Sequence, residues 1–308
     1  MIQDGALGTS TPTRPRTAAP VVWVNGQRMS ADAPHLSALD RGFTLADGVF
    51  ETMRVYDGHA FRLDAHIRRL SDALSALGIP LPTEMGNVVR QAVFEAGANG
   101  IRDASVRLTV SRGVGSPGLA ASPSSEPTIV VAVSPLPAFS PGLYTNGITV
   151  HIASGRRNER AMTAGLKTIA FTESVVALAA AHAAGADDAL FLDTEGHVSE
   201  GTSSNVFIAA ANDTGLLVTP PLSCGALPGI TRAAVIELAT ELGIGVDVRA
   251  IDYDELFASP EVFLTSSLRE IAPVVRVDGR SIGDGKPGSL TRRVMEAYAA
   301  LVSVECRG

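Results

Sequence analysis

The chain has 308 residues, of which 45% are hydrophobic and 5% aromatic, and its formal net charge is −7 at pH 7. This charge, without a basic stripe, argues against a nucleic-acid partner, and the lack of a long apolar run argues against a membrane partner. The length allows two domains or one large one. Cys224 and Cys306 fit neither a metal-ligand spacing nor a disulfide framework, so we expect no metal site.

Residues 1–20 are rich in Thr, Pro, Gly and Ala and lack the apolar segment of a signal peptide. We interpret them as a disordered tail and expect a cytoplasmic protein. The first apolar runs end in Asn25-Gly26 and Asp57-Gly58, which predict hairpin turns. Leucine and isoleucine on one face predict a helix over 65–77, with Asp64 as its N-cap.

These elements predict a small N-terminal α/β domain over residues 21–133. An interdomain linker is expected at 134–142, which holds three prolines and shows no periodicity. A larger domain over 143–308 follows. Because strands and helices alternate while many turns are hairpin-like, we expect an α+β (mixed α/β) fold whose sheets are largely antiparallel or mixed.

Lys167 begins the stretch that carries the most chemistry. A helix is expected over about 172–185, and a polar turn over 199–205. A single lysine is usually a solvated surface charge, and a cluster of Ser, Thr and Asn is usually a turn. Together the lysine and the polar turn suggest a cofactor site, because a lysine of lowered pKa can form a Schiff base with an aldehyde cofactor. Glu200 in the turn could then hold a ring nitrogen of that cofactor protonated.

A phosphate site is expected where Gly229 precedes the start of a helix. Free N–H groups and the helix dipole attract an anion there, although many helices begin this way without a ligand. Residues 265–267 form a second hydroxyl-rich turn. Arg69 lies on the helix over 65–77, where a solvated charge is the simplest interpretation of its side chain.

Five blocks of the chain, taken in order, carry a resemblance to a known family. They read DRGF…DGVFET…FRLDAHIRRL, LKT, EGTSSNVF, LPGITR and TSSLREIAPV, and the match covers about residues 21–300. The chain resembles the class-IV aminotransferases, the fold-type IV pyridoxal-phosphate enzymes that include branched-chain and D-amino-acid aminotransferases and aminodeoxychorismate lyases. The resemblance implies pyridoxal 5'-phosphate as cofactor and a larger C-terminal domain with a mixed, barrel-like sheet. It also implies a homodimer whose active site lies near the interface.

The resemblance assigns roles to individual residues. Lys167 is implied to be the catalytic Schiff-base lysine, and Glu200 to pair with the pyridine nitrogen. The other implied cofactor-binding residues hold the phosphate, pack against the ring or support the site: Arg69, Asn205, Leu227, Gly229, Ile230, Thr231, Ser266 and Ser267. The implied substrate pocket consists of Phe50, Thr52, Ser267 and Leu268.

Three functions are open at this level. The first is an aminotransferase that moves an amino group from an amino acid or amine to a 2-oxo acid. The second, which the TSSLREIAPV block favours, is an aminodeoxychorismate lyase that releases pyruvate and 4-aminobenzoate. The third is a non-catalytic scaffold of the same fold. Phe50 stands where the D-amino-acid enzymes have a tyrosine, and Thr172 stands where branched-chain enzymes have one, so the substrate is left open.

Overall fold

The computed structural model describes residues 19–33, 35–116, 118–121, 126–212 and 215–307. The predicted tail therefore lies outside the described residues, apart from its last two positions. Within the described ranges, no helix is long and apolar enough to cross a membrane.

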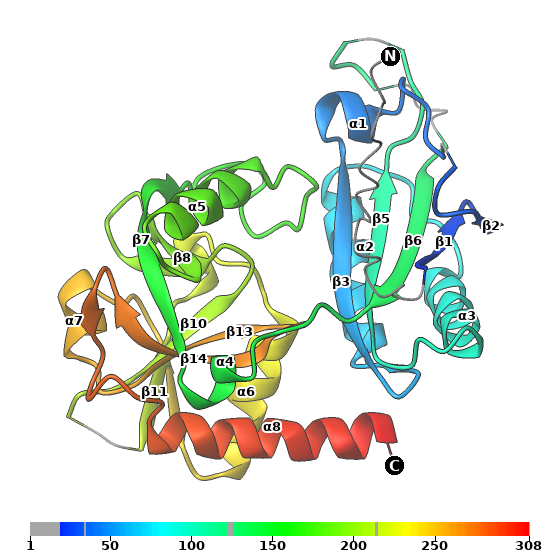
Figure 1. The fold of residues 1–308 in the computed structure, drawn as a ribbon. Coiled ribbons are helices and arrows are strands. Elements are labelled where there is room, and N and C mark those ends of the chain that lie inside the picture. Colours follow the sequence, from blue (N-terminus) through cyan, green and yellow to red (C-terminus); the bar gives the residue numbers. More distant parts are fainter. Residues whose placement is uncertain (1–18, 34, 117, 122–125, 213–214, 308) are drawn as a thin grey trace, which may run out of the picture.

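The first sheet is antiparallel and has the strand order β2-β1-β6-β5-β3-β4. Helices α2 and α3 cover one face of it (Figure 1), and their apolar side chains form one core with those of the strands. Because side chains alternate along a strand, Val49, Met53 and Val55 of β3 face this core while Phe50 and Thr52 line a cavity on the other side. The elements of this half are β1 Val21–Val24, β2 Gln27–Met29, α1 Arg41–Leu45, β3 Gly48–Tyr56, β4 His59–Ala60, α2 Leu63–Ala76, α3 Met85–Ala98, β5 Ala104–Ser111 and β6 Thr128–Pro135.

The start of α2 differs from the sequence prediction. The helix begins at Leu63, so Asp64 lies inside the first turn and is not the N-cap. The cap is Arg62, which has a left-handed backbone (φ 51°) and makes no side-chain capping bond. Its guanidinium instead pairs with Glu237 at 2.7 Å and Glu305 at 3.3 Å, both in the larger half. The residue at the cap position is therefore engaged in tertiary ion pairs and not in capping.

The second sheet is mixed and has the order β12-β11-β10-β13-β14-β7-β8-β9, with β15 paired to β14. Strand β7 pairs in parallel with both β8 and β14, and β11 pairs in parallel with β12, whereas the other pairs are antiparallel. The predicted α+β class with a mixed sheet in the larger half is confirmed. The elements of this half are α4 Gly142–Thr145, β7 Ile148–Arg157, α5 Thr172–Ala183, β8 Asp188–Asp193, β9 Val198–Gly201, β10 Asn205–Ala209, β11 Leu216–Thr219, η1 Leu222–Cys224, α6 Ile230–Glu241, β12 Gly245–Val248, α7 Tyr253–Ala258, β13 Val262–Ser266, β14 Glu270–Val277, β15 Arg280–Ser281 and α8 Ser289–Arg307.

The two sheets lie on either side of the predicted linker, although β6 extends to Pro135 and so enters the segment 134–142. The long helix α8 passes beneath both halves (Figure 1). Its Tyr298 packs edge-on against Phe61 of the first half, with ring centroids 5.5 Å apart, in a core that also holds Tyr56. The domain limits themselves stay a prediction.

Candidate active site

The backbone of Lys167 is attached to the first sheet, although the residue belongs to the chain segment of the larger half. The N–H of Phe50 donates to the Lys167 carbonyl at 2.9 Å, and the N–H of Ile169 donates to the Gly48 carbonyl at 3.0 Å. A Cβ at Gly48 would lie 2.5 Å from the Val110 carbonyl oxygen of β5 and 3.3 Å from Ile169 Cδ1, so the close packing of β5 and the lysine segment around this position requires glycine. The lysine segment therefore lies between the two sheets and extends the edge of β3.

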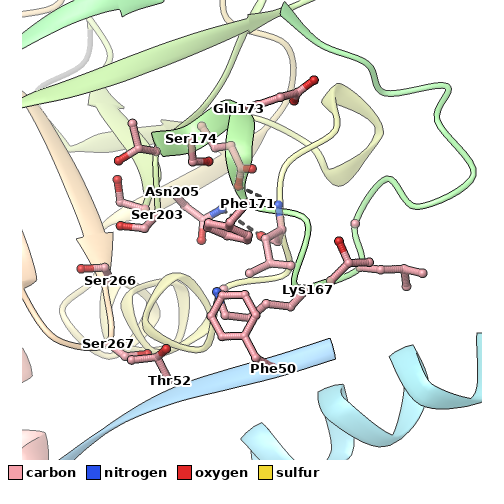
Figure 2. Close-up of a pocket in the computed structure, with 18 of the residues that line it drawn as sticks. Phe50, Thr52, Lys167, Phe171, Glu173, Ser174, Ser203, Asn205, Ser266 and Ser267 are labelled. Carbon is pink, nitrogen blue, oxygen red and sulfur yellow. Dashed lines mark hydrogen bonds between the residues drawn. The ribbon is translucent and has the colours of Figure 1, made fainter. Parts of the chain in front are cut away.

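The amine of Lys167 lies among aromatic rings. Its Nζ is 4.5 Å from the ring centroid of Phe50 and 5.1 Å from that of Phe171 (Figure 2). Burial lowers the pKa of Lys167 to about 8. At this pKa about a tenth of the amine is neutral at pH 7, against about 0.03% at its ordinary value. A neutral amine is the form that attacks an aldehyde or accepts a proton.

One cavity of about 800 Å³ lies between the halves and includes the lysine. Every residue that the sequence analysis placed in the cofactor site or the substrate pocket lines it: Phe50, Thr52, Arg69, Lys167, Glu200, Asn205, Leu227, Gly229, Ile230, Thr231, Ser266, Ser267 and Leu268. Figure 2 shows Ser266 and Ser267 at one side of the lysine and Asn205 and Ser203 above it. The structure thus brings all of them together, while their individual roles stay predictions.

Glu200 lies on β9 with its carboxylate held from two sides. It accepts hydrogen bonds from the Leu227 N–H at 2.8 Å and from Arg157 Nε at 3.1 Å. Burial raises the pKa of Glu200, and the charge of Arg157 opposes this rise. Arg157 is itself fixed by its bond to Ser174 Oγ at 3.0 Å and by the ring of Phe191, 4.1 Å from its guanidinium carbon. The carboxylate is therefore held rigidly at the cavity wall, as a partner for a ring nitrogen must be.

Arg69 projects from α2 and is held by a fully buried carboxylate. Its Nε and Nη2 donate to Glu51 at 2.7 and 2.6 Å, and its Nη1 donates to the Pro228 carbonyl at 2.7 Å. His66 Nδ1 also contacts Glu51, at 2.7 Å. Burial acts to raise the pKa of Glu51, but the bonds from His66 and Arg69 lower it to about 2. Each terminal nitrogen of Arg69 keeps one further N–H, which can bind an anion in the cavity.

The N-terminus of α6 lies at the cavity. Gly229 is its N-cap, and Ile230 and Thr231 form the first turn. A Cβ on Gly229 would come within 1.9 Å of Asn205 Oδ1, and Asn205 Nδ2 donates to the Leu227 carbonyl at 2.8 Å. Glycine is therefore needed because Asn205 lies so close. The free N–H groups of this helix end suit a phosphate.

The family described as Amino-transferase class IV matches residues 48–277. This chain belongs to the class IV aminotransferases. A putative branched-chain-amino-acid aminotransferase of Methanocaldococcus jannaschii is 36% identical over 278 residues, covering 90% of this chain and 94% of its own. A D-alanine aminotransferase of Bacillus licheniformis is 33% identical, covering 90% and 95%.

Solved structures share the fold along nearly the whole chain. The branched-chain amino acid aminotransferase of Escherichia coli superimposes with a TM-score of 0.86 at 28% identity, covering 92% of this chain and 94% of its own. A second branched-chain amino acid aminotransferase, solved with pyridoxamine 5'-phosphate, gives 0.85 at 29%, covering 93% and 95%. A 4-amino-4-deoxychorismate lyase from Pseudomonas aeruginosa gives 0.78 at 31%, covering 92% and 98%. The predictions of fold-type IV architecture, of pyridoxal 5'-phosphate as cofactor and of a transaminase are confirmed at the level of the family.

The cavity of this class IV aminotransferase fits the cofactor on its own polar atoms. Thr265 and Ser204 are 2% and 5% exposed, and within the described part of the chain their hydroxyl oxygens have no hydrogen-bond partner. Both residues line the cavity. A buried hydroxyl without a partner is costly, so a polar group in the cavity would stabilise both. A phosphate at α6 and a ring between Lys167 and Glu200 would supply such groups.

Three charged residues of the site have no role in the sequence analysis. Glu51 could have been noticed, because it is an acid among apolar residues on the core face of β3. Arg157 lies at the end of β7, outside the five blocks that carry the resemblance. Arg107 of β5 lies opposite Thr52, and its guanidinium carbon is 3.8 Å from the Phe50 ring centroid. Among the described residues Arg107 makes no ion pair, so it can offer its charge to a ligand in the cavity.

Proposed function

We propose that this aminotransferase moves the amino group of a 2-amino acid with an apolar side chain to a dicarboxylic 2-oxo acid. The observation that carries the proposal is the position of Arg107 on the cavity wall beside the Phe50 ring, which places one cation next to an apolar surface. The second carboxylate of a dicarboxylic 2-oxo acid can pair with Arg107. The aliphatic side chain of an amino acid can pack against Phe50 and Leu268. The branched-chain names of several relatives support this substrate class.

Bound pyridoxal phosphate supplies an aldehyde that joins an amine and a ring that accepts the electron pair of a broken C–H bond. Arg69 and the first turn of α6 would hold its phosphate, and Glu200 would face its ring nitrogen. Arg157 opposes the rise in the pKa of Glu200 that burial causes, and an ionised carboxylate there would stabilise a proton on that nitrogen. Lys167 Nζ would take the proton from the substrate α-carbon and return it on the cofactor side.

The lyase is the second candidate, because the TSSLREIAPV block resembles that group and because the lyase from Pseudomonas aeruginosa has a similar fold. It has less support than the transaminase, since the two sequence relatives described above are both named as aminotransferases. The two reactions differ in their need for an acceptor, because only the lyase releases pyruvate without a 2-oxo acid.

We include in the proposal a cytoplasmic homodimer. An apolar patch supports the dimer: Leu39, Phe43 and Leu119 are 59%, 77% and 86% exposed. Arg41 links the two segments of this patch, since its Nη1 and Nη2 donate to the carbonyls of Gly118 and Leu119 at 2.9 and 3.0 Å. Large exposed apolar side chains that are held rigidly are typical of a protein interface.

The decisive experiment is a panel of amino donors of both hands, including leucine, valine, alanine and (R)-amines, each with 2-oxoglutarate and pyruvate. Aminodeoxychorismate is run beside them without an acceptor. We expect the highest kcat/KM with an aliphatic amino acid and 2-oxoglutarate. Release of pyruvate from aminodeoxychorismate, with no transfer from any amino acid, would establish the lyase instead. A Lys167→Ala variant serves as the background for both reactions.

A further inference from the structure

The turn between β13 and β14 carries Ser266 into the cavity. Ser266 pairs with Glu270 across this hairpin, so that three residues form the loop. Glu270 has a left-handed backbone with φ 55°, a conformation that glycine adopts most readily. A glutamate thus occupies a position that favours glycine, and contacts from the other half bear on the same turn.

One peptide unit of the loop is fixed at both ends. The carbonyl of Leu268 accepts a hydrogen bond from Arg54 Nη1 at 2.8 Å. The N–H of the same peptide unit, that of Arg269, donates to Ser266 Oγ at 3.3 Å. Since a peptide unit is planar, fixing its oxygen also fixes the direction of its N–H. Arg54 thus determines how the loop N–H meets the hydroxyl of Ser266.

The hydroxyl of Ser266 keeps one hydrogen-bond donor for a group in the cavity. It already accepts a hydrogen bond from Arg269, and its single O–H can donate elsewhere. Ser266 lines the cavity that holds Lys167. A donor with a defined direction suits an oxyanion, either the cofactor phosphate or the substrate carboxylate.

Arg54 is well placed for this task because it comes from the other half of the molecule. It lies on β3, and its side chain is 16% exposed. Its Nη1 also pairs with Glu270 Oε1 at 3.1 Å, and Tyr56 OH donates to the same oxygen at 2.7 Å. The guanidinium carbon lies 4.6 Å from the Tyr56 ring centroid. The first sheet therefore holds a turn of the second sheet from outside.

We propose that Arg54 is a positioning residue that, through the Leu268–Arg269 peptide, directs the Ser266 hydroxyl toward an oxyanion in the cavity. This rests on the proposed function only in requiring that the cavity receives such an anion. The chemistry is shared by two sources, so the experiment has two arms. One titrates pyridoxal 5'-phosphate into the protein freed of cofactor, and the other titrates 4-methylvaleric acid into the holoenzyme.

Arg54→Met and Ser266→Ala are each expected to raise the dissociation constant at least about tenfold, and both in the same arm of the experiment. Because both act on one hydrogen bond, the double variant should be weaker than the worse single by no more than about threefold. Ser267→Ala is the matched comparison: its hydroxyl lies in the same turn but outside this chain of contacts, so its effect should multiply with that of Arg54→Met. Arg102→Met, which removes an exposed pair with Asp57, should change neither arm.

Two results would overturn the proposal. In the first, Arg54→Met stays within about twofold of the wild type in both arms. In the second, its effect multiplies with that of Ser266→Ala. Should Arg54→Met fail to fold, Arg54→Lys, which keeps the cation but loses the planar fork, carries the same comparison with a smaller effect. Neither arm requires turnover, so a failure of the proposed reaction and a failure of this inference remain distinguishable.

Discussion

The N–H of Phe50 donates a 2.9 Å hydrogen bond to the carbonyl of Lys167, which joins the lysine segment to the sheet of the other half. The same β3 residue places its ring 4.5 Å from the lysine amine. One strand residue therefore fixes both the backbone and the surroundings of the amine. The position of Lys167 depends on the two halves staying together.

The depressed pKa of Lys167 predicts a pH dependence for cofactor attachment. Below its pKa of about 8, the neutral fraction of the amine rises about tenfold per pH unit, and above it the fraction levels off. The rate at which the cofactor-free protein joins pyridoxal phosphate should follow this curve. Stopped-flow absorbance between pH 6 and pH 10 measures it, with Lys167→Ala as the blank. A rate still rising tenfold per unit at pH 9.5 would show an unperturbed lysine.

Glu51→Gln should destabilise the fold and loosen cofactor binding, because Arg69 and His66 lose their shared carboxylate. A carboxyl whose pKa falls from 4.5 to about 2 on folding contributes about 3 kcal/mol to the free energy of unfolding. Since the folded pKa is the lower one, this contribution is complete above pH 4.5 and disappears as the pH falls toward 2. Urea unfolding of both proteins at several pH values checks this, with the exposed Glu241→Gln as control. A constant difference between pH 7 and pH 2.5 would contradict it.

Arg107→Met should change KM for a dicarboxylic acceptor more than KM for an aliphatic one. A hydrogen bond to a charged group contributes about 1.5–3 kcal/mol, so KM for 2-oxoglutarate should rise about 10- to 150-fold. KM for an aliphatic 2-oxo acid should change much less, because such an acid has no second carboxylate. Steady-state kinetics with both acceptors gives the comparison. Equal effects on the two acceptors would remove Arg107 from dicarboxylate recognition.

Gly229→Ala should cost about 1–3 kcal/mol of stability through overpacking, because its Cβ would come within 1.9 Å of Asn205 Oδ1. The weaker cofactor binding that follows should be visible as a larger dissociation constant for pyridoxal phosphate. Gly97→Ala is the matched control, since nothing lies within 4 Å of a Cβ there and the residue is helical. That variant should be stabilised by up to about 1 kcal/mol. Equal melting temperatures for the two variants would refute the steric argument.

Phe43→Glu tests the dimer. The side chain of Phe43 is 77% exposed, so a charge there should leave the fold of a single chain intact while opposing association. Sedimentation velocity should show the wild type as a dimer and the variant shifted toward the monomer. Phe94, which is 78% exposed on α3 in another region, provides the control as Phe94→Glu. A wild type that sediments as a monomer at all concentrations would end the dimer proposal.

The sequence was sufficient to predict which residues of local motifs line the cavity, while their roles stay predictions. Lys167, Glu200 and the α6 start each occur in a short block whose residue types already indicate their chemistry, and the structure brings these blocks to one cavity. Arg107 and Glu51 were not recognised because a strand residue's partners depend on which face of the sheet meets the other half. A local sequence pattern shows that side chains alternate along a strand, but it does not show which face of the sheet meets the other half.

The pairing of segments that lie far apart in the chain could not be predicted from the sequence pattern either. Nothing near Lys167 indicates that its backbone pairs with β3, since this bond joins segments more than a hundred residues apart. The prediction of Asp64 as the N-cap of α2 was also wrong: the cap is Arg62, whose side chain pairs with Glu237 and Glu305 of the larger half. Tertiary contacts took precedence over local capping preference at this helix start.

The packing of α8 sets a rule for protein engineering. Tyr298 of this helix is buried against Phe61 and shares a core with Tyr56, both from the smaller half. A chimera that exchanged residues 21–135 for those of a relative would therefore lose its match with a helix that lies much further along the chain. Recombination between class IV enzymes should succeed more often when the segment bearing α8 is transferred together with the first sheet.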